Sequence, residues 1–438
     1  MKTKLNRRQL CVRLGSSVAL GAMPVSFARA NCVDEQKSLV VLFLRGGADG
    51  LSLVVPRGDE ANYLALRQND SGDIAIPPGG SDLELDGFFE LHPSLASFKA
   101  LFDSGDMAMV HAMGGANDYS HFTAQDAMER VMPGSASQLV RDGWLNRALE
   151  AMDGAGDLCA PNPVLNGVSI GPFMTKAIAG DVNRLAVAFP DIASVEYEGA
   201  FSGARAQTLR SIFSADNSLA GASGLAAFDT IASLDGIADQ PPGANYPSGN
   251  GGLNRNLQDA ARLIKNPELG VRMITVNNGG WDHHSNLLVN IRNRGSDLAN
   301  AVTAFWEDLG AARNRTCMLI VTEFGRTAAV NGNGGTDHGW GNVMFALGGG
   351  ISGGRVLSRA DPDQPGGGLA TPAGFWPGLA TNELHVQGSS GQPRDLKSTI
   401  DYRDVFGEVL ERFVGLDGLA VRDQVLRGYA PNYPGLFL

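Results

Sequence analysis

Short, nearly continuous apolar segments recur along the 438-residue chain and restrict its possible folds more than any other feature. Such segments are typical of strands buried on both faces, as in a parallel sheet covered by helices. They occupy residues 38–44, 107–113, 271–276, 317–322 and 343–347. Helical periodicity is found between or after them, over Leu91–Phe102, Phe122–Val131, Trp144–Met152, Leu287–Leu309 and Tyr402–Phe413. This alternation predicts an α/β fold with a mostly parallel central sheet and helices on both faces.

Length and loop composition indicate one large domain with insertions. A chain of roughly 400 residues exceeds the size at which a single core stops growing, so inserted segments or a second lobe are expected. We predict a single domain over residues 31–438, rich in insertions and loops around 195–255 and 355–395. Two stretches inside these regions, 239–252 and 361–379, are rich in Pro and Gly and are predicted to be long surface loops.

The first thirty residues have the layout of a cleavable export signal. Arg7 and Arg8 precede an apolar stretch at 18–27, and Ala30 ends an A-x-A cleavage sequence. An arginine pair before a weakly hydrophobic stretch is typical of the twin-arginine (Tat) pathway, and an ordinary secretory signal is the alternative. We therefore predict export by the Tat translocase to the periplasm or beyond the cell, with no stable membrane anchor.

Charge and cysteine content narrow the possible partners and crosslinks. The predicted signal contains six basic residues and no acidic residue, so the formal net charge of −11 becomes −17 once those six charges are removed. Nucleic-acid binding needs clustered Lys and Arg, so we expect no nucleic-acid partner. Cys32, Cys159 and Cys317 remain after the signal and allow at most one disulfide. Cys317 opens an apolar segment and is expected to be a buried small hydrophobic residue.

Polar residues that directly follow predicted strands mark the expected site, because open α/β sheets bind ligands beyond the carboxyl ends of their strands. Asp282, His283 and His284 follow the segment 271–276. One carboxylate and two imidazoles suit Zn²⁺, Mn²⁺ or Fe. An Asx turn with exposed histidines is the alternative, and this group alone leaves both interpretations open.

A second polar group follows the strand predicted next along the chain. Glu323 comes directly after that strand, and Asp337 and His338 lie in a glycine-flanked segment. An ion pair between Glu323 and Arg326 and a mobile loop over 335–341 are the alternatives. The joint appearance of both groups after two successive strands favours a metal site made by Asp282, His283, His284, Glu323, Asp337 and His338.

Two other strand ends provide catalytic candidates. Arg45 and Asp49 follow the segment 38–44, where glycines permit a tight turn and Asp49 is a further candidate metal ligand. Ser120 and His121 lie at the start of a predicted helix. A serine there benefits from the helix dipole and free amides as a nucleophile or an anion-binding group, and a plain N-cap is the alternative. We take Ser120, His121 and Arg45 as catalytic candidates.

A family resemblance is carried by the stretches FLRGGADGLSLVVP (43–56), LHPSLASFKALFDSGDMAMVHAMG (91–114), SHF (120–122), GGWDHHSN (279–286) and TEFGRTAAVNGNGGTDHGWG (322–341). In order and spacing they resemble the Tat-exported bacterial family catalogued as domain of unknown function 1501. That family is similar in fold to alkaline phosphatases, sulfatases and cofactor-independent phosphoglycerate mutases. The resemblance implies an alkaline-phosphatase-like fold, metal ligands from several strand ends, and a Ser or Thr nucleophile at a helix start.

By position, the resemblance implies a metal-binding aspartate at Asp49 and the nucleophile at Ser120. It implies later ligands at Asp282, His284, Glu323 and His338. The sequence departs from the family where Asp-Thr-His is more usual, since His283 stands in place of the Thr and becomes an extra candidate. The superfamily's later Asp-His pair is Glu323–Phe324 here, which departs from a full two-metal site.

These observations predict a metal-dependent hydrolase of phosphate or sulfate esters, with zinc or manganese as the cofactor and a small-molecule or glycan ester as the substrate. The alternative is a non-catalytic exported protein that uses the same crevice to bind a glycan or a partner protein, or that assists assembly.

Overall fold

The computed structural model describes residues 36–158, 163–180, 186–195, 203–248, 251–360, 368–387 and 392–437. The predicted Tat signal over residues 1–30 lies outside these residues, as do Cys32 and Cys159. Cys317 is described, and it is a buried free thiol, as the sequence predicted. Within the described ranges, no helix has the length and apolar character needed to cross a membrane.

The central sheet has nine strands. Eight of them follow the order β12-β6-β11-β10-β1-β9-β7-β8, and the ninth, β17, pairs with β6. Its strands are β1 (Ser38–Arg45), β6 (Met107–Gly114), β7 (Gly167–Ile170), β8 (Ala186–Phe189), β9 (Met273–Gly279), β10 (Thr316–Val321), β11 (Asn342–Gly348), β12 (Val356–Leu357) and β17 (Ile400–Asp401). The five apolar segments form β1, β6, β9, β10 and β11, which confirms these predicted strands.

Strand directions explain why several chain segments meet at one edge of the sheet. β1 runs parallel to both β9 and β10, and β7 runs parallel to β8 and β9. β11 is antiparallel to β10 and β6. The amino end of β11 therefore lies at the same edge as the carboxyl ends of β1, β6, β9 and β10. The sheet is thus mostly parallel, as predicted, and segment 322–341 connects β10 to β11 along this edge.

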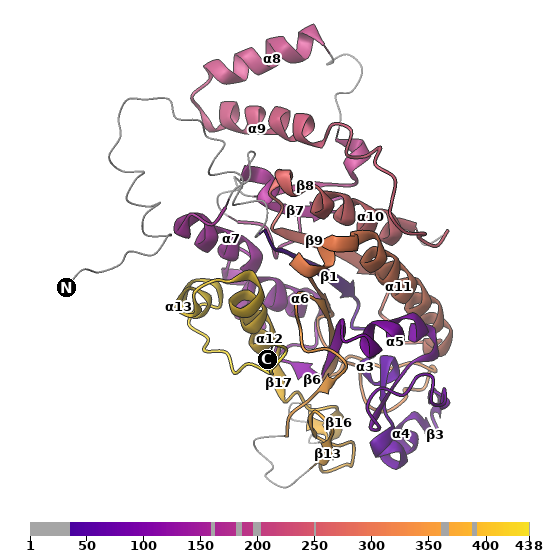
Figure 1. Ribbon diagram of the computed structural model, residues 1–438. Helices are drawn as coiled ribbons and strands as arrows, with labels where there is room; N and C mark the ends of the chain where they lie inside the picture. Colours follow the sequence, from indigo (N-terminus) through magenta and orange to yellow (C-terminus); the bar gives the residue numbers. More distant parts are fainter. Residues whose placement is uncertain are drawn as a thin grey trace, which may run out of the picture. The chain divides into compact units, whose positions relative to one another are not determined.

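Helices accompany the sheet along its whole length (Figure 1). They are α3 (Gly50–Leu53), α4 (Glu60–Arg67), α5 (Ala96–Asp103), α6 (His121–Arg130), α7 (Trp144–Ala155), α8 (Ala204–Ala215), α9 (Leu219–Leu234), α10 (Gly251–Lys265), α11 (Leu287–Leu309), α12 (Tyr402–Glu408) and α13 (Gly418–Ala420). Four predicted helices correspond to α6, α7, α11 and α12.

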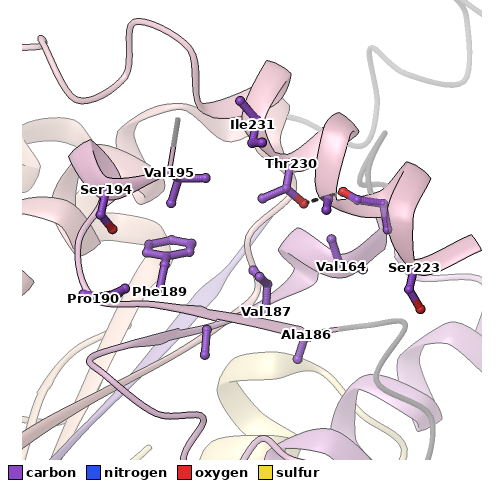
Figure 2. A pocket seen from close by; sticks show the side chains of 13 residues that line it. Val164, Ala186, Val187, Phe189, Pro190, Ser194, Val195, Ser223, Thr230 and Ile231 are labelled. Atoms are coloured by element: carbon purple, nitrogen blue, oxygen red, sulfur yellow. Dashed lines mark hydrogen bonds between the residues drawn. The ribbon is translucent and has the colours of Figure 1, made fainter. Parts of the chain in front are cut away.

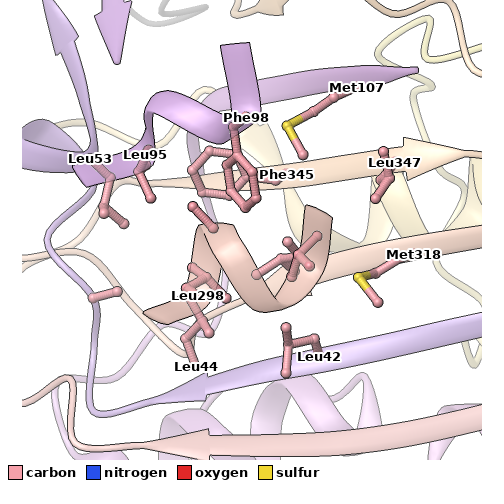
Figure 3. Close-up of a cluster of buried hydrophobic side chains, with 14 of the residues drawn as sticks. Leu42, Leu44, Leu53, Leu95, Phe98, Met107, Leu298, Met318, Phe345 and Leu347 are labelled. Carbon is pink, nitrogen blue, oxygen red and sulfur yellow. The ribbon is translucent and has the colours of Figure 1, made fainter. Parts of the chain in front are cut away.

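Alternate residues of β1 belong to two separate apolar clusters, as expected for a strand covered on both sides. Val40, Leu42 and Leu44 join the cluster to which α5, α10 and α11 contribute. Leu39, Val41 and Phe43 join the cluster to which α6, α7 and α12 contribute. Figure 3 shows part of the first cluster, with Leu298 of α11 above β1. The helices therefore cover both faces of the sheet, as the alternating pattern predicted.

The structure adds elements in regions that were predicted differently. The helix predicted over Leu91–Phe102 begins later, because Phe89–Leu91 forms β5, which pairs with β2 (Val54–Pro56). The region around 195–255 contains α8 and α9, which pack against each other, and the start of α10. Segment 361–379 includes a hairpin of β13 (Leu369–Thr371) and β14 (Gly374–Trp376). Ala, Gly and Ser dilute the apolar periodicity of α9, although Ser218 caps it by accepting from two backbone amides.

Candidate metal centre

Three residues from different segments bring possible ligand atoms together at the carboxyl edge of the sheet. They are His121 at the start of α6, Asp282 after β9 and His338 before β11, and their ligand atoms lie within 4.8 Å of one another. His121 Nε2 is 3.5 Å from Asp282 Oδ2, and His338 Nε2 is 3.7 Å from Asp282 Oδ1. Two imidazoles and one carboxylate form a donor set that divalent transition metals accept.

A fourth donor, His284, adjoins this triad. Its Nε2 atom lies 3.0 Å from His338 Nε2 and 3.1 Å from Asp282 Oδ1. The Nε2 atoms of all three imidazoles are therefore directed toward the Asp282 carboxylate. The side chain of Asp282 is 46% exposed, so the group is accessible from solvent.

Each of the three imidazoles has an oxygen acceptor at its Nδ1 atom. His121 Nδ1 is 2.7 Å from Glu323 Oε1, and His284 Nδ1 is 2.8 Å from Asp337 Oδ1. His338 Nδ1 is 2.6 Å from the backbone carbonyl oxygen of Tyr119. Carbonyl and carboxylate oxygens accept hydrogen bonds, so each Nδ1 carries a proton, which leaves Nε2 as the ring atom available to a metal ion. This is the arrangement by which proteins orient metal-binding histidines.

The Nε2 atom of His121 supports the same interpretation. It is buried and has no hydrogen-bond partner among the described residues. A buried polar atom without a partner is costly, and an ion is one of the groups that can satisfy it. The donor set and this orphaned atom together fit a divalent ion held by His121, Asp282 and His338, with His284 adjoining this triad.

The electrostatics keep Asp282 ionised. Partial burial raises the pKa of its carboxyl, but the hydrogen bond and charge of Arg326 outweigh burial and hold the pKa below its usual range. Arg326 is buried and also donates to the carbonyl oxygens of Gly46, Gly47 and Thr336. Its position is therefore fixed by the backbone around the site.

Glu323 orients His121 through a hydrogen bond to its Nδ1 atom. Its side chain is fully buried, and Oε1 accepts from His121, from Gln125 and from the backbone amide of Gly46. Burial raises the pKa of Glu323, but these hydrogen bonds outweigh it and hold the pKa below its usual value. The ion pair considered between Glu323 and Arg326 is not the arrangement found, because Arg326 binds Asp282 instead.

Burial also lowers the pKa of His338, and the charge of Arg326 lowers it further, although the hydrogen bond to the Tyr119 carbonyl opposes this shift. A neutral His338 is the form that binds a metal ion. Asp337 has its pKa held low because His284 and Asn331 hydrogen-bond to it more strongly than burial opposes ionisation. Asp337 is therefore an ionised carboxylate that accepts from His284 Nδ1 and orients this ring.

Asp49 lies apart from the cluster, in a buried ion pair. Both of its carboxylate oxygens accept from Arg67, at 2.9 and 3.1 Å. They also accept from the Ser52 amide and the Thr336 hydroxyl. Burial opposes ionisation of Asp49, but Arg67 holds its pKa below the usual value. The structure thus places this predicted ligand in a supporting position.

His283 also faces away from the other two members of its group. It is buried, its Nε2 atom lies 3.0 Å from the Gly280 carbonyl oxygen, and burial lowers its pKa. The Asx-turn alternative with exposed histidines is not what the structure shows, since Asp282 and His284 take part in the cluster and His283 is internal.

The catalytic candidates lie on the α6 side of the cluster. Arg45 pairs with Glu129 and donates to Gln125, which in turn binds Glu323. Ser120 is the exposed N-cap residue of α6, yet its hydroxyl makes no capping hydrogen bond. Its neighbours on both sides, the Tyr119 carbonyl and His121, touch the cluster. Ser120 therefore lies in sequence between two residues that contact the cluster, and its hydroxyl is not used for capping.

Several contributing residues were not singled out by sequence reasoning. None of three side chains follows a strand directly: those of Gln125, Arg67 and Thr336. The fourth contact is made by the backbone carbonyl of Tyr119, which the residue type does not reveal. Helical spacing offers one signal that was available, since Gln125 follows His121 by one turn of α6. Arg67 belongs to α4, which has no local sequence relation to the site.

An apolar pocket lies elsewhere in the described part of the chain. It has a volume of about 450 Å³ and is formed around β8 and α9, by residues such as Val187, Phe189, Thr230 and Ile231 (Figure 2). Apolar and short hydroxyl-bearing side chains line it, and none of its described lining residues is ionisable. This pocket has none of the groups needed for acid–base or metal chemistry.

Fold and site define an α/β protein with a histidine- and aspartate-rich candidate metal centre at the carboxyl edge of its sheet. Residues 242–422 match the family described as Protein of unknown function (DUF1501), which supports the family resemblance seen in the sequence. The matched region contains Asp282, His284 and His338 but begins after His121. No curated protein matches the chain.

Proposed function

We propose that this protein is an exported metal-dependent hydrolase of phosphate or sulfate esters, built on an alkaline-phosphatase-like fold. The observation that carries the proposal is the convergence of His121, Asp282 and His338, with His284 next to His338 and Asp282 and with each imidazole oriented through its Nδ1 atom. A set of three nitrogen donors and one oxygen donor suits zinc, and manganese is the second candidate.

The geometry favours one ion over two. Asp49 and Glu323, which the superfamily resemblance implied as ligands, are engaged by Arg67 and by His121 respectively. A bound divalent ion would polarise the ester and favour the ionised form of an attacking hydroxyl or water. The chain's own residues fix the three imidazoles through their Nδ1 atoms, which leaves the Nε2 atoms of His121, His284 and His338 facing that ion.

Ser120 is the proposed nucleophile. It lies between two residues that touch the cluster, at the amino end of α6, where free amides and the helix dipole stabilise negative charge. Its hydroxyl is not used for capping, so the plain N-cap alternative has no hydrogen bond to support it.

Turnover of an aryl phosphate and an aryl sulfate by zinc- or manganese-loaded protein tests this proposal. Ser120→Ala should reduce kcat by at least about 10³-fold, because loss of a nucleophile affects the transition state directly. Ser135→Ala changes another exposed serine, in the turn after α6, and should leave kcat unchanged. Retained activity in Ser120→Ala would make a water molecule the attacker.

One observation favours the alternative of a binding protein. Phe122 follows His121 directly and its side chain is 85% exposed. An exposed aromatic ring that adjoins a cluster residue in sequence suits contact with a glycan or a partner protein. Absence of turnover of both esters by metal-loaded wild-type protein would favour this second function.

Export by the Tat translocase to the periplasm or the medium is part of the proposal. It is supported by the Arg7–Arg8 pair and the apolar stretch that follows. Replacing both arginines with lysine should leave precursor in the cytoplasm, and normal export of that variant would indicate the general secretory route.

A further inference from the structure

Segment 322–341 carries Asp337 and His338 but contains no helix. A metal site needs its ligands held within about 0.5 Å, which loops achieve only when other groups fix them. Contacts outside this segment must therefore hold the turn that contains His338.

Thr336 immediately precedes Asp337 and is completely buried. Each of its polar groups bonds to a different part of the site. Its amide donates to the carbonyl oxygen of His283, and its own carbonyl oxygen accepts from Arg326. Its hydroxyl donates to Asp49 Oδ2 over 2.9 Å. Thr336 is thus hydrogen-bonded to the segment that carries His284, to Arg326, which binds Asp282, and to Asp49 in the turn after β1.

Asp49, which accepts from the Thr336 hydroxyl, is itself held by a buried ion pair with Arg67. Asp49 is 1% exposed and Arg67 is 0% exposed, and two hydrogen bonds join them. A bidentate pair between buried groups has one favoured geometry, because both partners would otherwise lose their hydrogen bonds. A direct contact between α4 and segment 322–341 runs from the Val330 amide to the Leu66 carbonyl oxygen.

We propose that Thr336 is a positioning residue of the metal centre: its hydroxyl ties the turn bearing Asp337 and His338 to the buried Asp49–Arg67 pair and so keeps the imidazoles at ligand distance. This inference rests on the proposed metal site. It also gives Asp49 a role at the centre that does not require contact with the ion.

Zinc affinity and the visible spectrum of bound cobalt(II) test the inference on the full-length protein. Thr336→Val keeps the shape of the side chain but removes the hydroxyl, and should weaken zinc binding about tenfold, at the lower end of the effect of supporting contacts on metal affinity. The cobalt spectrum should change as well, because it reports ligand geometry. Thr336→Ser restores the hydroxyl and should restore both properties.

Thr316→Val is the matched control. Thr316 is also fully buried, and its hydroxyl donates to the Ala312 carbonyl oxygen. Thr316 is the first residue of β10, so it lies at the end of that strand away from the metal centre. This control should bind zinc as the wild type does. Arg67→Lys is the second test variant if Thr336→Val does not fold, because it keeps the buried charge but loses the bidentate geometry.

If folded Thr336→Val binds zinc with wild-type affinity and gives the wild-type cobalt(II) spectrum, the positioning role is overturned and the metal centre stands. The same result in folded Arg67→Lys has the same meaning where that variant replaces Thr336→Val. Failure of the wild type itself to bind zinc or cobalt(II) would overturn the metal centre and this inference with it.

Discussion

The Nε2 atoms of His284 and His338 lie 3.0 Å apart, although both rings use Nδ1 as the donor to an oxygen. With both Nδ1 atoms acting as donors, the two Nε2 atoms face each other, which is unfavourable without a proton or a metal ion between them. Protonation of His338 is disfavoured, because burial lowers its pKa and the Arg326 guanidinium lowers it further. A divalent cation satisfies both lone pairs and the adjacent Asp282 carboxylate.

Glu323→Gln should weaken zinc binding by about 10- to 100-fold, because the uncharged amide no longer increases the basicity of His121. The side chain keeps its size, so the buried position remains filled. Competition with a chromophoric chelator measures the effect. Glu408→Gln changes another buried glutamate, which accepts from the Gly435 and Phe437 amides, and should leave zinc affinity unaltered. Equal affinity in Glu323→Gln and wild type would show that Glu323 does not act through His121.

Asp49→Asn distinguishes support from ligation. Removal of one charge from the buried pair leaves Arg67 uncompensated, which should lower the free energy of unfolding by about 3–5 kcal/mol in the metal-free protein. Urea unfolding without metal measures this loss. The opposite pattern, unchanged metal-free stability with complete loss of zinc binding, would make Asp49 a direct ligand.

The pH dependence of stability should include a contribution from His111. Burial lowers the pKa of His111 to about 4, against an ordinary value of 6.5, and its Nε2 atom lies 2.9 Å from the Val54 carbonyl oxygen. Because the unfolded chain binds the proton first, this stabilisation is present above the unfolded pKa and is lost as the pH falls toward 4. The full difference corresponds to about 3 kcal/mol.

Unfolding of His111→Gln compared with wild type between pH 7 and pH 4 isolates that contribution, since the carboxylates are common to both proteins. The glutamine amide can still donate to Val54. The wild type should lose more stability over this interval than the variant, and parallel curves would show that His111 does not titrate as its burial implies.

The central sheet was predictable because each of its long strands is a separate apolar segment, and because strands alternate with helices. α8 and α9 were less accessible to sequence reasoning. Their small and polar residues give little periodic contrast, and Ser218 is the clearest local sign of a helix there. The helix predicted from Leu91 began too early, since pairing of β5 with β2 is a tertiary contact that periodicity does not contain.

The general position of the site followed from one rule, that ligands gather beyond the carboxyl ends of strands. That rule does not give the direction of each side chain. Asp282 and His284 join the cluster, while His283 between them turns inward to Gly280. Asp49 follows a strand end as well, but Arg67 approaches it from α4, a contact that neither residue's sequence neighbourhood contains.

Metal content of the purified protein tests the account most directly. After loading with zinc or manganese and removal of excess ion, elemental analysis should find about one divalent ion per chain, as expected for a site with one set of ligands. Asp282→Asn combined with His284→Ala should abolish binding, and should also abolish the rise in thermal midpoint that loading produces. The paired control, Asp103→Asn with His92→Ala, changes the same residue types outside the cluster and should bind as the wild type does. Metal-free wild-type protein after loading, or undiminished binding in Asp282→Asn/His284→Ala, would contradict the proposed metal centre.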